Sequence, residues 1–356
     1  MSSNNAPRTA TRRLLPKNLL NRGKMTDTSF LLTITITLFI AIYALAVIFL
    51  GDKGFGKIQM LFNLFNENSA LIVIACGLSI VMVTGSIDIS VGGSTALICT
   101  TCIVCLNNYG FNFFTSLLLA LAIGLTFGIV QGFLIAYVEI QPFIVTLAGM
   151  FLGRGLVALI EVNQIQVANK AFEALSGKRI EIPFLGDVNK KGIFIQSKLE
   201  YGVIVALIIV AIIFFLLKRT SLGRSFYAVG GNPQSALMLG INVRRTRYVA
   251  HVLCGLLAGI GGFLYLFRPR SGSVQQATGL EMDAIAASII GGTLLTGGVG
   301  NIIGTLFGVL TSGTVLLIVT AIGSQDPWWP QITRAGMLCF FIILQSVICS
   351  RKKKTN

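Results

Sequence analysis

Few side chains in this sequence could carry out chemistry, and their types and spacing argue against a catalytic centre. The chain has one histidine, His251, and its seven cysteines show no metal-type spacing with histidine partners, so no zinc site is expected. There is no His-Glu-x-x-His motif, and no second buried aspartate is paired with Asp88 as in a membrane protease. We therefore predict no catalytic residue, no metal and no cofactor.

The sequence also lacks the usual signs of a protein that draws on nucleotides or ion gradients. It contains no G-x-x-x-x-G-K-[ST] phosphate loop, because the "SGKR" stretch ending at Arg179 has Phe172 where the first glycine belongs. Ion-driven carriers usually bury several ionisable groups along their path, whereas only Asp88, Glu139 and Arg154 lie near the interior of the long apolar runs. Energy for transport is therefore expected to come from another protein.

Asp88 is an acidic residue that could line a path for a polar solute. It lies in a polar turn between two apolar runs, near Ser86, Ser90, Ser94 and Thr95. In one interpretation its carboxylate caps the following helix or satisfies free backbone N–H groups. In the other, Asp88, Ser90 and Ser94 line the translocation path, and the sequence leaves both open.

Other charged residues raise the same choice between structure and transport. Arg154 lies in the middle of an apolar run, where it must find a carboxylate, backbone carbonyls or a water-filled cavity. It is a candidate for the path as well as for a structural pairing. Glu281 and Asp283, just before a later apolar run, are expected to be exposed, and either solvated or in contact with a partner protein.

The stretch "SLGRSFYAVGGNPQSALMLGINVRRTR", residues 221–247, contains no acidic residue. Asn232 is a favoured N-cap, Pro233 suits the first helical position and Gly240 suits a helix end, so a short helix is predicted over 233–239. A helix this short is unstable alone. The absence of Lys and Arg from 232–241 favours a groove on another protein over lipid headgroups as its docking site. The apolar residues that it offers are Ala236, Leu237, Met238 and Leu239.

These residues must be positioned by membrane-spanning helices. Hydrophobic residues make up 54% of the 356-residue chain and charged residues 12%, with a mean hydropathy of +0.81, as in a polytopic membrane protein. We predict an all-α integral membrane protein with about ten transmembrane helices, the eighth of them short and bounded by glycine. The apolar windows are 30–50, 69–85, 90–106, 113–137, 142–160, 201–217, 248–267, 284–296, 301–322 and 331–349.

The distribution of charge predicts the orientation. Residues 1–28, 218–247 and 350–356 together hold 16 basic residues and one acid, Asp27. Because cytoplasmic segments beside spans are enriched in Lys and Arg, both termini and the 218–247 loop are predicted to be cytoplasmic. The chain then consists of a basic tail (1–28), a transmembrane domain (29–349) and a second basic tail (350–356).

This topology accounts for the whole formal net charge of +15. Nucleic-acid binding, which such a charge could otherwise suggest, is therefore not predicted. The first tail is expected to be disordered or to touch the membrane surface, with lipid as its partner.

Two rows of small residues predict close helix packing within the membrane. Glycines recur at four-residue spacing at 124, 128 and 132, and again at 300, 304 and 308, where Ser312 continues the row. Such rows let helix backbones approach one another. We expect them to be structural, with a gate hinge as the alternative.

Four blocks of the sequence resemble the permease subunits of bacterial ribose-type ABC sugar importers. They occur in order, within a match from about Phe30 to Cys349, and the last two look most like the galactofuranose-type members. Relatives with this fold also move nucleosides or branched-chain amino acids, so the architecture does not fix the substrate. The blocks are "GSIDISVGGSTAL" (85–97), "QPFIVTLAGMFLGRG" (141–155), "YAVGGNPQSALMLGI" (227–241) and "GLEMDAIAASIIGGTLLTGGVGNIIGTLFGVL" (279–310).

The resemblance implies a multi-pass permease of the bacterial plasma membrane that carries a sugar inward and is not itself an enzyme. Its implied partners are a second permease, identical or paralogous, a cytoplasmic ABC ATPase and an extracytoplasmic sugar-binding protein. The loop matching 221–243 would carry the coupling helix that fits a cleft on the ATPase. The alternatives are a permease for a nucleoside or a branched-chain amino acid, and an independent secondary carrier. The implied coupling residues are Asn232, Pro233, Ala236, Leu237, Met238, Leu239 and Gly240.

Overall fold

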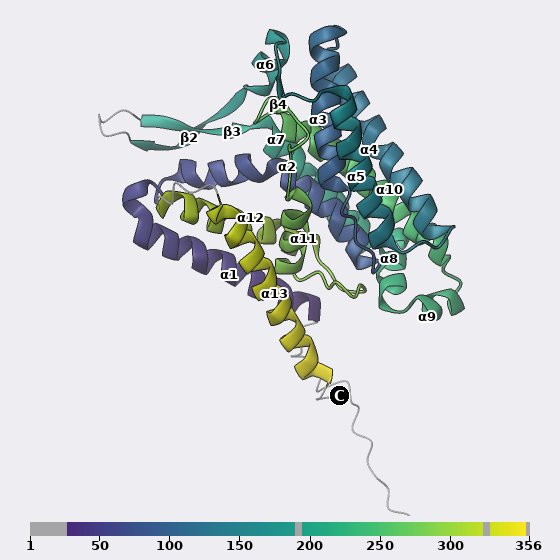
Figure 1. Ribbon diagram of the computed structural model, residues 1–356. Helices are drawn as coiled ribbons and strands as arrows, with labels where there is room; N and C mark the ends of the chain where they lie inside the picture. The colour runs from purple at the N-terminus through teal and green to yellow at the C-terminus, as the bar shows by residue number, and fades with distance from the viewer. Residues whose placement is uncertain (1–26, 189–193, 323–327, 354–356) are drawn as a thin grey trace, which may run out of the picture.

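The computed structural model describes residues 27–188, 194–322 and 328–353, and these ranges are mostly helical (Figure 1). The predicted tails at 1–28 and 350–356 therefore lie largely outside the described residues, although 350–353 continue the last helix. The long helices are α1 (Asp27–Leu50), α2 (Ile58–Val83), α3 (Val91–Asn108), α4 (Phe113–Ala136), α5 (Pro142–Ile160), α7 (Tyr201–Arg219), α10 (Val243–Leu266), α12 (Ile302–Ile322) and α13 (Trp329–Lys353). The shorter helices are η2 (Gly51–Lys53), α6 (Lys170–Ser176), α8 (Ser221–Gly231), α9 (Pro233–Met238) and α11 (Leu280–Ile290).

Eight helices of the described ranges are long and apolar enough to cross a membrane, namely α1, α2, α3, α4, α5, α7, α10 and α12. All ten predicted windows overlap a helix. The eighth window falls on α11, which has only 11 residues, and the tenth falls on α13, which is not among the eight. The multi-pass helical class is therefore confirmed, while the count of ten spans and the orientation remain predictions.

Helix α2 is the centre of the core. From Ile72 to Val83 all its residues are buried, and α7, α10, α11 and α12 pack around it. A helix that is apolar on every side is stable only when protein or lipid surrounds it. By contrast, α4 and α5 keep large apolar side chains exposed, among them Phe114, Leu118, Phe151 and Leu159, as expected for helices that face lipid.

The predicted glycine rows lie at close helix contacts. A Cβ added to Gly124 would lie 2.3 Å from the carbonyl oxygen of Gly255 on α10, so only glycine fits there. In the second row, a Cβ at Gly308 would lie 2.0 Å from the Ala287 carbonyl oxygen of α11. The structural interpretation of both rows is therefore supported, and the glycines of α10 that complete the first contact were not predicted.

A β-hairpin departs from the all-α prediction. Strand β2 (Arg179–Val188) pairs with β3 (Phe194–Glu200) in antiparallel register, with Ile180 opposite Leu199, and a short pair joins β1 (Ile165–Gln166) to β4 (Ser271–Gly272). The apolar runs of the spans dominate the sequence pattern and conceal this hairpin, although Ile180 and Ile182 alternate with charged residues as in a strand. Figure 1 shows the hairpin and α6 at one end of the protein, and α8 and α9 at the opposite end.

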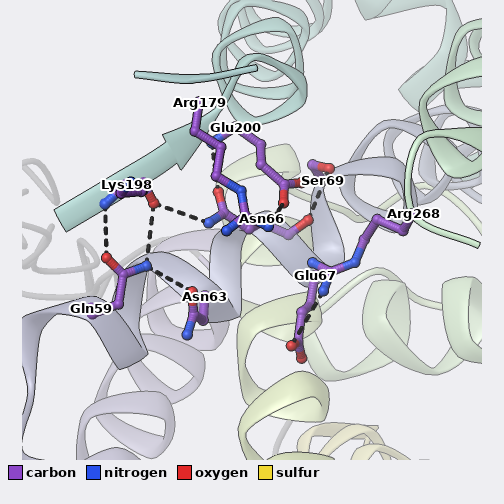
Figure 2. A network of polar contacts seen from close by, with 9 residues as sticks. All are labelled: Gln59, Asn63, Asn66, Glu67, Ser69, Arg179, Lys198, Glu200 and Arg268. Carbon is purple, nitrogen blue, oxygen red and sulfur yellow. Dashed lines mark hydrogen bonds and ion pairs between the residues drawn. The ribbon is translucent and has the colours of Figure 1, made fainter. Parts of the chain in front are cut away.

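Side chains of α2 fasten the hairpin to the helical body (Figure 2). The Gln59 side-chain amide pairs with the backbone of Lys198, accepting from its N–H at 2.7 Å and donating to its carbonyl at 3.3 Å. Asn66 accepts from the Glu200 N–H at 2.9 Å and donates to the Lys198 carbonyl at 3.2 Å. Two amides thus bind the edge of β3 as a neighbouring strand would. Figure 2 also shows Arg268 reaching Glu67, an ion pair of 3.5 Å.

Candidate functional site

The short helix predicted in the 218–247 loop is present as α9. The Asn232 side chain accepts a hydrogen bond from the Ser235 N–H at 3.0 Å, and Pro233 occupies the first turn. At the other end Gly240 has φ +79°, and its N–H donates to the Leu237 carbonyl at 2.9 Å. The capping residues therefore act as predicted, and the helix ends one residue earlier than expected, at Met238.

The apolar tip of α9, defined here as Leu237, Met238 and Leu239, is largely exposed. These side chains are 64%, 87% and 79% exposed, whereas Ala236 is 1% exposed and packs inward. Of the predicted apolar surface, Ala236 thus anchors the helix and the other three are available to another molecule. A cluster of large apolar side chains on an otherwise polar loop is typical of a protein contact.

Helix α8 was not predicted, and it holds α9 against the core. Its N-cap Thr220 accepts from the Gly223 N–H at 3.2 Å, and Phe226 and Val229 are buried. The Tyr227 hydroxyl donates to the Gly300 carbonyl at 2.9 Å. The sequence signal for α8 is Thr220 followed by a small apolar face. This signal is weaker than the Asn-Pro pair that marks the start of α9.

A cavity of about 790 Å³ lies beside α9. It is lined by α9 residues including Leu237 and by the loop between α4 and α5, which carries Glu139. Arg244, at the start of α10, reaches Glu139 with 2.7 Å between Nη2 and Oε1. Glu139 itself has φ +63°, an unusual backbone conformation for a non-glycine residue. The α4–α5 loop and the α9–α10 segment therefore meet on the α9 side of the protein.

Asp88 lies in the turn between α2 and α3, and its carboxylate is occupied locally. Its Oδ1 accepts from the Ser90 N–H at 2.9 Å and from the Ser90 hydroxyl at 2.6 Å. Asp88, Ser90 and the nearby Gln131 are all buried, and the Ser90 hydroxyl also lies 3.1 Å from Gln131 Oε1. His251 of α10 is likewise buried, and neither of its ring nitrogens has a hydrogen-bond partner among the described residues. These contacts favour the structural interpretation of Asp88, and a place on the path remains a prediction.

Ser94 and Arg154 form hydrogen bonds with backbone carbonyls and none with Asp88. The buried Ser94 hydroxyl donates to the Val91 carbonyl of its own helix at 3.1 Å. Arg154 Nη1 donates to the carbonyls of Val274 at 2.8 Å and Gln276 at 3.4 Å. Arg154 therefore takes backbone carbonyls as partners, one of the options that its position required, and it holds the loop that precedes α11.

The expectation that Glu281 and Asp283 are exposed is wrong. Both lie in the first turn of α11 and are buried. Asp283 forms an ion pair with Arg334 of α13, with 3.3 Å between Oδ1 and Nε. Arg334 was not singled out in the sequence, because nothing in its local context links it to a residue on another helix.

Comparison with known proteins places these features in a family context. The family model described as "Branched-chain amino acid transport system / permease component" matches residues 60–342. The inner membrane ABC transporter permease protein YjfF of Escherichia coli (strain K12) is 34% identical over 292 residues, covering 82% of this chain and 85% of that protein. No solved structure gives a significant match.

Two further relatives are named for sugars. The fructose import permease protein FruG of Bifidobacterium longum (strain NCC 2705) is 31% identical, covering 88% of this chain and 91% of the relative. The ribose import permease protein RbsC of Escherichia coli (strain K12) is 33% identical, covering 87% and 91%. The similarity therefore extends over nearly the whole chain.

Proposed function

The chain belongs to this permease family, and over most of its length it is 34% identical to an ABC transporter permease and 31% and 33% identical to permeases named for fructose and ribose import. We propose that it is the membrane-spanning subunit of an ATP-driven importer that carries a sugar into the cytoplasm. Its location is the bacterial inner membrane, as the name of YjfF states for that relative. In this role it provides the passage and another subunit hydrolyses ATP.

The apolar tip of α9 is the observation that carries the proposal. Three large apolar side chains stand exposed at the end of a capped helix of six residues, and a helix this short is unstable unless it packs against protein. The partner expected for an ABC importer permease is a cytoplasmic ABC ATPase. The tip is expected to enter a groove on that ATPase, in the way that amphipathic helices bind grooves.

The connections of α9 explain how a push on the tip would reach the membrane. Through Gly240 and Asn242 the helix continues into α10, and through α8 it is tied to the start of α12 by the Tyr227 hydroxyl. A displacement of α9 would therefore move α10 and α12 as packed units, a rigid-body change.

The partners at the other end follow from the same proposal. The hairpin end would face the extracytoplasmic sugar-binding protein, and the basic 218–247 loop would face the cytoplasm. A second permease, identical or paralogous, would complete the assembly. Membrane lipid surrounds the exposed apolar faces of α4 and α5.

A sugar is the substrate class favoured by the relatives, whose names include ribose, fructose and galactose. Galactofuranose, suggested by the last two sequence blocks, remains a prediction about this chain. Nucleosides and branched-chain amino acids are the alternatives, and they are tested with the same uptake assay by changing the labelled solute.

A charge placed on the α9 tip tests the proposal. We expect Leu237→Arg to abolish both binding of the ATPase and uptake in proteoliposomes that contain the ATPase and the binding protein. Leu237→Met should keep both, because it keeps an apolar side chain. Leu175→Arg makes the same change at an exposed leucine of α6, at the hairpin end, and should leave ATPase binding intact. Normal ATPase binding and uptake by Leu237→Arg would refute the coupling role and favour an independent carrier.

A further inference from the structure

Helix α11 is too short to cross a membrane, and its first turn carries two buried carboxylates, Glu281 and Asp283. Its 11 residues give about 16 Å of helix, whereas the hydrocarbon core is roughly 30 Å thick. Residues 291–301 then run as turns and irregular backbone to α12. Such backbone is tolerated at membrane depth where it is buried in protein or lines a cavity, and transporter sites are commonly built around broken helices.

A cavity of about 380 Å³, called here the α11 cavity, opens beside the start of this helix. Its walls include Asp283 of α11, Ser312 of α12, and Gln331 and Arg334 of α13. The volume falls within the range of about 300–1,000 Å³ that small-molecule sites occupy. Carboxylate, hydroxyl, amide and guanidinium groups therefore converge from three helices on one small space, and all of them exchange hydrogen bonds with hydroxyl groups.

Charged groups in and beside this cavity have hydrogen-bonding positions that no described residue fills. Although Asp283 Oδ1 lies 3.3 Å from Arg334 Nε, that N–H makes no hydrogen bond to any described residue. Glu281 does not line the cavity: its Oε1 accepts from the Gly279 N–H at 3.3 Å, and its Oε2 lies against Gly92 of α3 without a hydrogen-bond partner among the described residues. Ionisable groups within a membrane domain are costly and mark functional sites by default.

Arg154 supports the rim of the α11 cavity. Its guanidinium holds the Val274 and Gln276 carbonyls, and the same loop continues to Thr278 and Gly279, which line the cavity. Arg154 is therefore a positioning residue for this site. Arg154, one of the path residues predicted from sequence, does not itself line the cavity.

We propose that the α11 cavity is a transit site for the sugar, in which Asp283 accepts and Arg334 donates hydrogen bonds to hydroxyl groups of one monosaccharide. This inference rests on the proposed function, because it needs a sugar to be the cargo. Paired carboxylate and guanidinium groups match the alternating donors and acceptors of a sugar hydroxyl pair. None of the described residues that line the cavity is aromatic, so no stacking platform strengthens binding. Weak binding is what passage requires, since a transit site must release its ligand.

Neutral substitutions separate a substrate contact from a structural ion pair. Asp283→Asn and Arg334→Gln each remove one charge, and the double variant removes both and leaves no unpaired charge, which should restore folding. We expect all three to lower the maximal uptake of radiolabelled D-ribose, D-fructose and D-galactose at least 10-fold in proteoliposomes of the complete transporter. ATPase binding should be unchanged. Uptake near the wild-type level in the double variant would show that the pair is only structural and would overturn the proposal.

Chemical labelling gives a second test that does not depend on removing the charges. Ala335 lines the cavity, and we expect Ala335→Cys, in a Cys339→Ser background, to react with a small charged methanethiosulfonate. Sugar-loaded binding protein and ATP should slow this reaction at least threefold. Thr333→Cys lies on the same helix outside the cavity lining and should not respond to sugar. Equal rates at Ala335→Cys with and without sugar, or no reaction at all, would contradict a transit site.

The two proposals fail in distinguishable ways. If Leu237→Arg abolishes uptake while the Asp283 and Arg334 variants transport normally, the coupling role stands and the transit site is wrong. If Leu237→Arg transports normally, the proposed function itself is wrong.

Discussion

Helix α9 and the α11 cavity differ in how their residues are held. Neighbours shape α9, since Asn232 caps Ser235 and the Gly240 N–H returns to Leu237. At the cavity, Asp283 and Arg334 come from separate helices, and the preceding loop is held by Arg154, 120 positions before Val274. A locally determined helix can move as a unit. The geometry of a site assembled from separate helices changes whenever those helices shift. Movement of α9 could therefore alter the α11 cavity through the helices between them.

The largest expected effect comes from breaking the junction between α8 and the core. A Cβ at Gly230 would lie 1.8 Å from the Val83 carbonyl oxygen of α2. Gly230→Val therefore forces the backbones of α8 and α2 apart and should lower the free energy of unfolding by about 3 kcal/mol or more. We expect loss of uptake with the cavity residues intact. Gly231→Val is the matched control, because a Cβ there has nothing within 4 Å. Equal uptake by the two variants would show that α8 does not transmit movement from α9 to the core.

Arg154→Leu should have the next largest effect, at the other region. It removes the donor to the Val274 and Gln276 carbonyls, and hydrogen bonds from a charged group contribute about 1.5–3 kcal/mol. The loop before α11 should loosen, which hydrogen–deuterium exchange of residues 273–279 would detect. We expect reduced uptake with normal ATPase binding. Unchanged exchange in that loop would contradict the positioning role.

Removing the cap of α9 should have a moderate effect confined to the coupling end. Asn232→Ala loses the bond to the Ser235 N–H and should destabilise the helix by about 1 kcal/mol. ATPase binding is expected to weaken several-fold, measured by co-purification from membranes, while Asn232→Asp retains the cap and should bind normally. If Asn232→Ala instead altered sugar protection at Ala335→Cys without affecting ATPase binding, the separation of the two regions would be wrong.

The smallest effect is expected from the ion pair between Glu139 and Arg244. Both side chains are more than half exposed, and exposed pairs contribute about 0–1 kcal/mol. A double-mutant cycle with Glu139→Gln and Arg244→Gln should therefore give a coupling energy below about 1 kcal/mol in thermal unfolding of the purified permease. A larger value would mean that this pair fixes the α9 segment to the α4–α5 loop.

The difference between the two regions also explains what the sequence could predict. The caps of α9 and the glycine rows depend on residue types at fixed short spacing, so the sequence alone predicts them. Arg334 and the burial of Asp283 depend on which helices meet, and no local pattern encodes that. The β2–β3 hairpin lies in between, because its alternation is visible in the sequence but is short beside the long apolar runs of the spans.

Asp88 shows the same limit in a single residue. The polar turn is visible in the sequence, and the bonds from Ser90 agree with a carboxylate that satisfies a free backbone N–H, although no side chain caps α3. Gln131, which accepts from the Ser90 hydroxyl, comes from α4, so this contact could not be predicted from sequence spacing.

The most direct test of the account is a cross-link from the α9 tip. Met238→Cys, which replaces the most exposed side chain of the tip, should cross-link to the ATPase subunit in the assembled transporter, with a yield that changes when ATP and vanadate are added. Cross-linking only to lipid, or labelling of Met238→Cys by an impermeant reagent from outside the cell, would contradict the central claim. That claim is that α9 contacts the ATPase and moves with its nucleotide cycle.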